Sequence, residues 1–185
     1  AHDLQERIDR NALFEVDALL ERYQGRRVWT WFQEKLDGLQ AEPRQEKEVL
    51  GNLFVILNHL EVLRDNWKSY VKEGKNKLLE SEMSREQRND FGFVFTETMM
   101  EQLMIYFVYT YFCGAVYNGQ AYGKLKFAVA GSILIRELAK AHFLKYDHLE
   151  FCDITEAARR YAREVEHSDF NKCKMEQMLQ DEEKF

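Results

Sequence analysis

Apolar residues recur every three or four positions along most of the chain, the spacing that places them on one face of an α-helix. In the first half this pattern predicts helices over residues 3–23, 27–39 and 46–72. Gly25 fits the end of the first helix, because glycine readily takes up the left-handed conformation that follows a helix. Pro43 is the only proline, and it fits the first turn of the third helix.

The second half has the same spacing after a polar interval. We expect Gly74 to begin this interval, and Ser84 followed by Gln87 is the pattern of a capping box that starts a new helix. No stretch alternates with a period of two long enough to require a strand. We therefore predict an all-α bundle of six to eight helices around a central apolar helix. Its second half comprises a helix over 84–112, a turn over 115–121, and helices over 122–145, about 153–166 and 169–182.

Composition agrees with one compact helical unit. The 185 residues include one proline and nine glycines, and 45% are hydrophobic. This excludes collagen, Pro/Gly-rich linkers and disordered chains. We expect N-terminal helices over 1–90 to pack on a C-terminal helical core over 91–185. The chain lacks an initiator Met, so we expect the two parts to form one domain of a longer protein.

Charge and cysteine usage point to a cytoplasmic protein without nucleic acid as partner. The chain has 26 Lys and Arg against 32 Asp and Glu, a net charge of −6, and the two signs are interleaved rather than gathered on one face. Cys113, Cys152 and Cys173 lie far apart and form neither a metal-binding spacing nor a disulfide framework. Cys113 lies in an apolar run, where we expect a small core residue. The N-terminus does not resemble a signal peptide.

Residues 102–117 form a stretch without formal charge, which raises the question of a membrane segment. A bilayer span needs about twenty predominantly apolar residues, and this stretch has only sixteen. Glu97 and Glu101 lie just before it. We therefore expect a core helix and no membrane association.

Few residue patterns in the chain are typical of catalysis. Glu164 and His167 form one Glu-x-x-His motif, whose two side chains would share a helix face. Helical di-metal sites need two such motifs together with further glutamates, so no metal site is predicted. Nothing marks a histidine partner that could activate Cys113 as a nucleophile, and no phosphate-binding glycine loop is present.

An unusual density of aromatic residues follows Glu101. One interpretation is that these side chains pack in the core and that their phenol groups reach polar partners at its rim. They also fit an aromatic pocket for an ammonium group, in which Glu97 or Glu101 supplies the negative charge. The aromatic residues are Tyr106, Phe107, Tyr109, Tyr111, Phe112, Tyr117 and Tyr122.

Two motifs and the helix between them resemble the C-terminal region of the flagellin lysine-N-methylase family. Residues 101–107 read Glu-Gln-Leu-Met-Ile-Tyr-Phe, where the family has approximately Glu-Asn-Tyr-Leu-Val-Asn-Tyr. Residues 161–168 read Tyr-Ala-Arg-Glu-Val-Glu-His-Ser and contain the Glu-His pair of the family. The asparagines and tyrosines of the first motif are replaced here. The resemblance covers roughly residues 97–180.

The resemblance implies an enzyme that transfers a methyl group from S-adenosylmethionine to surface lysines of flagellin. It also implies a cysteine-rich domain, N-terminal to the helical part, that holds an iron–sulfur cluster. No cluster motif occurs in this chain. We therefore expect no cofactor in the chain itself and no activity from it alone. Its role would be to support the cluster domain, to complete the substrate cleft or to bind flagellin.

The resemblance leads to a hypothesis for the site. Glu101 would engage the ammonium group of the substrate, and Tyr106 and Tyr109 would line the approach to it. Glu166 and His167 would hold the junction between two helices, and no catalytic residue is identified. The alternative is a non-catalytic all-α module that binds a protein partner or a ligand.

Overall fold

The computed structural model describes residues 2–37 and 43–180, and every regular element in these ranges is helical. The all-α prediction is confirmed. Ten of the described helices have seven residues or more, so the predicted six to eight was too few. The α-helices are α1 (His2–Asp9), α2 (Val16–Arg22), α3 (Arg26–Asp37), α4 (Pro43–His59), α5 (Trp67–Glu80), α6 (Arg85–Val94), α7 (Glu97–Tyr111), α8 (Ala115–Asn118), α9 (Ala121–Tyr146), α10 (Phe151–Tyr161) and α11 (Asp169–Met178). Shorter elements are the 3-10 turns η1 (Leu13–Glu15) and η2 (Phe112–Gly114) and the π-helical turn η3 (Ala162–Glu166).

The count is higher because three predicted helices are each divided by a turn. Asn11 has a positive φ of 54° between α1 and α2. The helix predicted over 46–72 is interrupted between α4 and α5, and that over 84–112 is interrupted where the Thr96 side chain caps α7. Leu60 and Phe95 are buried in the last two breaks, so the apolar spacing continues through them and hides the turns. The charged tail expected after residue 180 lies outside the described residues.

The predicted helix end at Gly74 is wrong, because this glycine lies inside α5 at its contact with α9. A Cβ atom at Gly74 would lie 3.4 Å from Leu138 Cδ2 and 3.6 Å from the Ala141 Cβ atom. The absent side chain therefore allows the two helices to approach closely. The capping box is confirmed: the Gln87 N–H donates to Ser84 Oγ, and the Ser84 N–H donates to Gln87 Oε1, both at 3.1 Å.

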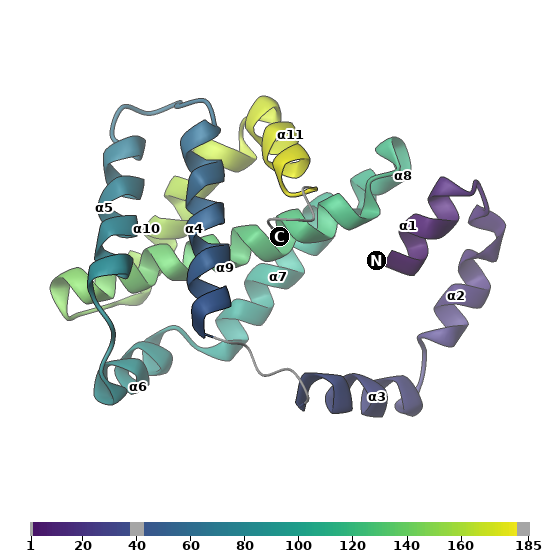
Figure 1. The fold of residues 1–185 in the computed structure, drawn as a ribbon, viewed down its shortest axis with the longest axis horizontal. Coiled ribbons are helices and arrows are strands. Elements are labelled where there is room, and N and C mark those ends of the chain that lie inside the picture. Colours follow the sequence, from purple (N-terminus) through teal and green to yellow (C-terminus); the bar gives the residue numbers. More distant parts are fainter. Residues whose placement is uncertain (1, 38–42, 181–185) are drawn as a thin grey trace.

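The 26-residue helix α9 runs through the centre of the molecule, with α5, α7, α10 and α11 packed against it (Figure 1). Small and large apolar residues occur on all sides of α9, the pattern of a helix enclosed by others. The helix predicted over 122–145 is thus confirmed, and it is the central one. By contrast, α7 covers one side of α9 and is itself partly exposed, with Tyr109 80% exposed. No helix in the described part of the chain is long and apolar enough to cross a membrane.

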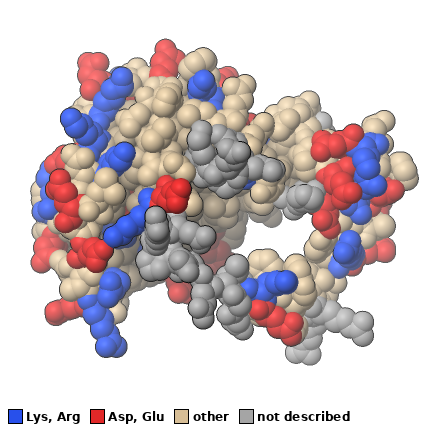
Figure 2. Space-filling model, in the orientation of Figure 1, with Lys and Arg blue, Asp and Glu red and all other residues tan. Residues whose placement is uncertain are grey.

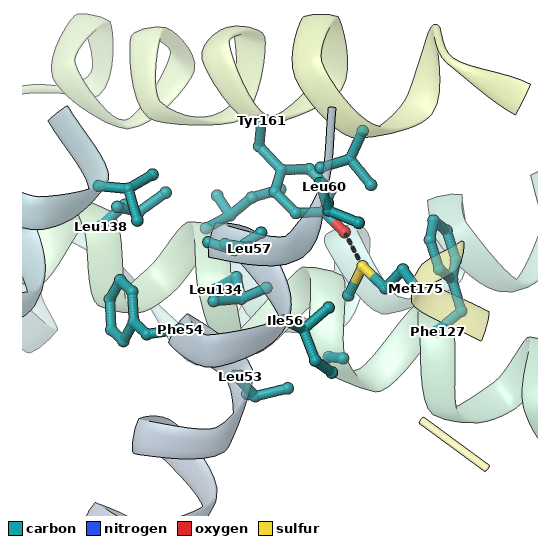
Figure 3. Packing of buried hydrophobic residues seen from close by; sticks show 14 of the residues in the cluster. Leu53, Phe54, Ile56, Leu57, Leu60, Phe127, Leu134, Leu138, Tyr161 and Met175 are labelled. Carbon is teal, nitrogen blue, oxygen red and sulfur yellow. Dashed lines mark hydrogen bonds between the residues drawn. The ribbon is translucent and has the colours of Figure 1, made fainter. Parts of the chain in front are cut away.

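The main core lies where α4 and α9 meet α10 and α11 (Figure 3). The buried Tyr161 ring points into this cluster, and its hydroxyl group donates to Met175 Sδ at 3.6 Å. A second cluster packs α6 against the C-terminal half of α9 and the start of α10, and includes Phe91, Phe143 and Ile154. The core therefore draws on residues from both halves of the chain.

Helices α1 to α3 lead away from this core (Figure 1). The Gln5 side chain joins α1 to the start of α9, donating to the Gly119 carbonyl at 2.5 Å and accepting from the Tyr122 N–H at 3.2 Å. Trp29 and Trp31 of α3 are at least half exposed. On the face seen in Figure 2, acidic and basic side chains are interspersed.

Candidate functional site

A carboxyl group with two tyrosine partners joins α7 to the turn before α11. The hydroxyl groups of Tyr106 and Tyr111 donate to the same Oε2 atom of Glu166, at 2.8 and 2.7 Å. Glu166 is the last residue of η3 and is 8% exposed. This contact brings together Tyr106 and Glu166, two of the residues singled out in the sequence. Of the aromatic series, Tyr106 and Tyr111 thus reach a polar partner here.

The π-helical turn determines which side chains of this segment face the core. The His167 N–H donates to the Ala162 carbonyl at 2.9 Å, five residues back, so one extra residue is accommodated in the turn. As a result Glu164 and Glu166 are both buried, whereas His167 is exposed. The expectation that Glu164 and His167 share a helix face is therefore wrong, because that expectation assumed regular α-helical spacing.

Burial and the neighbouring carboxyl group keep the tyrosines protonated. Loss of hydration is the main cause that raises the pKa of Tyr106 and of Tyr111, and the hydrogen bonds to Glu166 raise it further. Burial likewise raises the pKa of Tyr161 well above its ordinary value. The phenol groups are thus hydrogen-bond donors over the whole physiological pH range.

Next to this cluster, a buried amide ties the same segment to the loop between α4 and α5. Asn171 donates to the Glu61 and Glu164 carbonyl groups at 2.9 and 2.6 Å and accepts from the Glu61 N–H at 2.8 Å. The Leu63 N–H donates to Glu164 Oε2 at 2.9 Å. The junction before α11 is therefore held by Glu164, Glu166 and Asn171, while the side chain of His167 is exposed to solvent.

The predicted substrate-binding residues lie on α7 but do not form one cluster. Glu101 and Tyr109 are exposed, and Tyr106 alone of the three contacts Glu166. Tyr111 completes the cluster, although its sequence context marks it only as one member of the aromatic series. Its position five residues after Tyr106 gives no signal of a shared partner, because that partner comes from a segment some fifty residues away.

The cysteines of this chain do not fit an iron–sulfur cluster. Cys113, Cys152 and Cys173 are all exposed and belong to η2, α10 and α11. Within residues 2–37 and 43–180, no three His, Cys, Asp or Glu residues are grouped so that they could hold a metal ion. The expected core position of Cys113 is wrong, because η2 turns this residue outward at the end of α7.

A cleft that the sequence did not reveal lies between α5, α9 and α10, with a volume of about 520 Å³. Gly74, Leu138 and Ala141 line it at the contact of α5 with α9. Charged pairs bridge its sides: Lys145 Nζ lies 2.5 Å from Glu73 Oε1, and His142 Nε2 lies 3.5 Å from Asp153 Oδ1. No motif could have indicated it, since its residues come from three separate segments.

Comparison with known proteins identifies a family over the full length. The family model described as the FliB lysine N-methylase C-terminal domain matches residues 1–185. A search of curated proteins and a search of solved structures give no match. The family match extends the resemblance seen in residues 97–180 to the N-terminal helices. The chain therefore belongs to the FliB lysine N-methylase C-terminal domain family.

Proposed function

We propose that this chain is the helical domain of a protein lysine N-methylase and that it binds the lysine-bearing substrate for the catalytic part of that enzyme. The observation that carries the proposal is the family match over all 185 residues. The resemblance of the sequence motifs supports flagellin as the substrate. The helices supply an ordered surface for docking, and the chain also supports the domain that performs the transfer.

The cofactors of the reaction belong to the rest of the enzyme in this proposal. S-adenosylmethionine would supply the methyl group as an electrophilic sulfonium. An iron–sulfur cluster would be held by a cysteine-rich domain, since the three cysteines here lie on separate elements. The residues of this chain then act by binding and orienting the protein substrate.

The exposed face of α7 is the surface we assign to the substrate. Glu101 can attract a lysine ammonium, and Tyr109 can offer its ring face to the same type of cation. The two residues lie eight positions apart, so they span about 12 Å along the helix. Each exposed contact is worth at most about 1 kcal/mol, so the face would bind a segment through several contacts together.

The Glu166 cluster fixes this face in position. Because Tyr106 and Tyr111 are both hydrogen-bonded to Glu166, α7 is held to η3 and cannot rotate freely about its axis. Glu101 is exposed, so it can attract an ammonium group but cannot lower the pKa of that group by burial. Removal of the proton before methyl transfer is therefore assigned to the catalytic part.

The test uses the complete methylase, flagellin and labelled S-adenosylmethionine. The double variant E101Q/Y109A should raise the KM for flagellin about fivefold to tenfold, since it removes two weak contacts, and should leave kcat nearly unchanged. The matched control is E48Q/Y117A, which changes an exposed glutamate of α4 and an exposed tyrosine of α8. An unchanged KM would reject the assignment of the α7 face to substrate binding. Absence of methyl transfer by the complete protein would reject the proposed enzymatic function.

A second candidate function is a non-catalytic interaction module, and α3 favours it. Trp29, Trp31 and Phe32 expose large apolar surfaces on this helix, as docking surfaces often do. The double variant W29A/F32A should then lower the affinity of this chain for its partner domain at least tenfold in calorimetry. E101Q would leave that affinity unchanged. If W29A/F32A binds as tightly as the unaltered chain, the module does not use α3.

A further inference from the structure

We propose that the cleft between α5, α9 and α10 binds a small monocarboxylate with an apolar body. Neither the family nor the proposed function assigns a ligand to this cleft. Its volume of about 520 Å³ lies within the range of small-molecule sites in proteins, roughly 300–1,000 Å³. Three features of its lining specify the ligand.

The first feature is a guanidinium group with one edge free. Arg160 lies over the Tyr70 ring, with its Cζ atom 4.6 Å from the ring centroid, and its Nε–H donates to Glu156 Oε1 at 2.7 Å. Among the described residues, the hydrogen bonds of Arg160 involve Nε alone, so its two Nη groups donate none. The stacking and the Nε bond hold the planar group in place. The two Nη groups can therefore bind a carboxylate in bidentate fashion, through two parallel hydrogen bonds.

The second feature is a lysine without an acidic partner. Lys77 lines the cleft from α5, is only partly exposed and has no acidic partner among the described residues. Each carboxylate of the lining already has a partner: Glu73 pairs with Lys145, Asp153 with His142, and Glu156 with Arg160.

Glu156 pairs with a second cation, Arg159, at 2.6 Å. The lining itself holds three basic residues, Lys77, Lys145 and Arg160, against the three carboxylates. Among the described residues, Lys77 is the one of these cations without an acidic partner. One negative charge on the ligand can pair with Lys77. A dianion such as a phosphate monoester would leave its second charge opposed by Glu73 and Asp153.

The third feature is apolar surface beside these charges. Leu138 and Ala141 line the cleft from α9, next to Gly74, which presents no side chain. Tyr70 and Tyr146 add aromatic rings from α5 and α9. A ligand with an aryl or alkyl body can bury that body here while its carboxylate reaches Arg160 and Lys77.

The test titrates the 185-residue chain with 3-phenylpropionate and follows backbone amide shifts by NMR. We expect saturable shifts on α5, α9 and α10 around the cleft. The K77Q variant should weaken binding about fivefold, which corresponds to the loss of one partly exposed ion pair. R160K keeps the positive charge but cannot form bidentate hydrogen bonds, so it should weaken binding by a similar factor. K68Q, at an exposed position of α5 away from the cleft, is the matched control and should bind as the unaltered chain does.

Two further probes separate charge from shape. 3-Phenylpropylamine has the same body with a cation, and phenyl phosphate carries a dianion, so both should bind more weakly than 3-phenylpropionate. The proposal is overturned if the amine or the phosphate binds at least as tightly, if K77Q and R160K bind as K68Q does, or if millimolar 3-phenylpropionate gives no saturable shift at the cleft. Methyl transfer is not measured in this test, so its result is separate from that of the proposed function.

Discussion

Glu166 carries a carboxyl group into the protein interior, where the loss of hydration must be compensated by hydrogen bonds. Tyr106 and Tyr111 supply two, both to Oε2. Both phenols belong to α7, so their hydrogen bonds join the Glu166 carboxyl group to this one helix. Tyr111 is the more enclosed of the two, since Tyr106 is half exposed. The hydroxyl group of Tyr111 is therefore the more important of the two for stability.

The Y111F variant removes this hydroxyl group and leaves the ring packing in place. We expect it to lower the free energy of unfolding by about 1–2 kcal/mol, because Glu166 loses one of its two donors inside the protein. Urea unfolding followed by circular dichroism measures the change. Y109F is the control, since the Tyr109 ring is 80% exposed and its variant should unfold within about 0.5 kcal/mol of the unaltered chain. Equal stability of Y111F and Y109F would contradict the role assigned to the cluster.

At the scale of the helices, glycine has two different structural roles in this chain. Gly25 ends a helical run with a positive φ of 107°, as the sequence predicts for a glycine after a helix. Gly74 and Gly131 lie inside helices, where each allows a neighbour to approach. At Gly131 a Cβ atom would lie 2.9 Å from Phe107 Cζ, closer than real Cβ atoms pack, and 3.0 Å from the Tyr161 hydroxyl oxygen, a tight contact.

Replacing these two helical glycines by alanine should affect stability differently. G131A should destabilise the protein by about 1–2 kcal/mol, because the steric conflict with α7 and α10 exceeds the gain in helix propensity. G74A finds ordinary van der Waals contacts and should be neutral or stabilising by up to about 1 kcal/mol. Thermal and urea unfolding of both variants under the same conditions provide the comparison. A G131A variant as stable as G74A would show that the α7–α9 contact can relax.

The helices that the sequence predicted well are those whose ends carry local signals. The capping box at Ser84 and the single proline at Pro43 mark two starts correctly, and the length of α9 follows from its uninterrupted apolar pattern. The breaks after α4 and α6 were missed, because Leu60 and Phe95 are buried turn residues that continue the helical spacing. The π-helical turn was missed for a similar reason, since one extra residue leaves no mark in composition.

The candidate site was predictable only in part, because its contacts join distant segments. The sequence singled out Tyr106 and Glu166, but nothing in it indicated that they contact each other. The cleft draws its charges from α5, α9 and α10, and these charges resemble ordinary solvated helix faces in the sequence. Only the packing of α5 and α10 against α9 gives them a common surface.

At the scale of the whole molecule, tyrosines that burial keeps neutral make the free energy of unfolding depend on pH in the alkaline range. Burial raises the pKa of Tyr70 to about 12 and that of Tyr161 well above its ordinary value of 10.0. Above pH 10 the unfolded chain releases these phenolic protons while the folded chain retains them. The unfolded state then binds fewer protons, so the free energy of unfolding falls as pH rises. Below pH 10 both states are protonated, and this contribution is fully present.

The Y161F variant tests this coupling, because phenylalanine releases no proton in either state. Between pH 9 and 11 its free energy of unfolding should fall less steeply with pH than that of the unaltered chain. Urea unfolding at several pH values in this range measures the two slopes. Y117F, which changes a 93% exposed tyrosine, should keep the slope of the unaltered chain. Identical slopes for Y161F and Y117F would contradict the retention of the Tyr161 proton.

The central position of α9 fixes its rotational phase as well as its length. One part of the helix, around Gly131, meets α7 and Tyr161, and its last turns form one side of the cleft. A single residue inserted between them would rotate everything beyond it by about 100°, which would turn the cleft residues away from α5. Seven inserted residues would restore the phase to within about 20° but would separate the two regions by a further 10 Å or so. Natural length variation should therefore occur in the loops around α9, while the number of residues between Gly131 and the cleft stays constant.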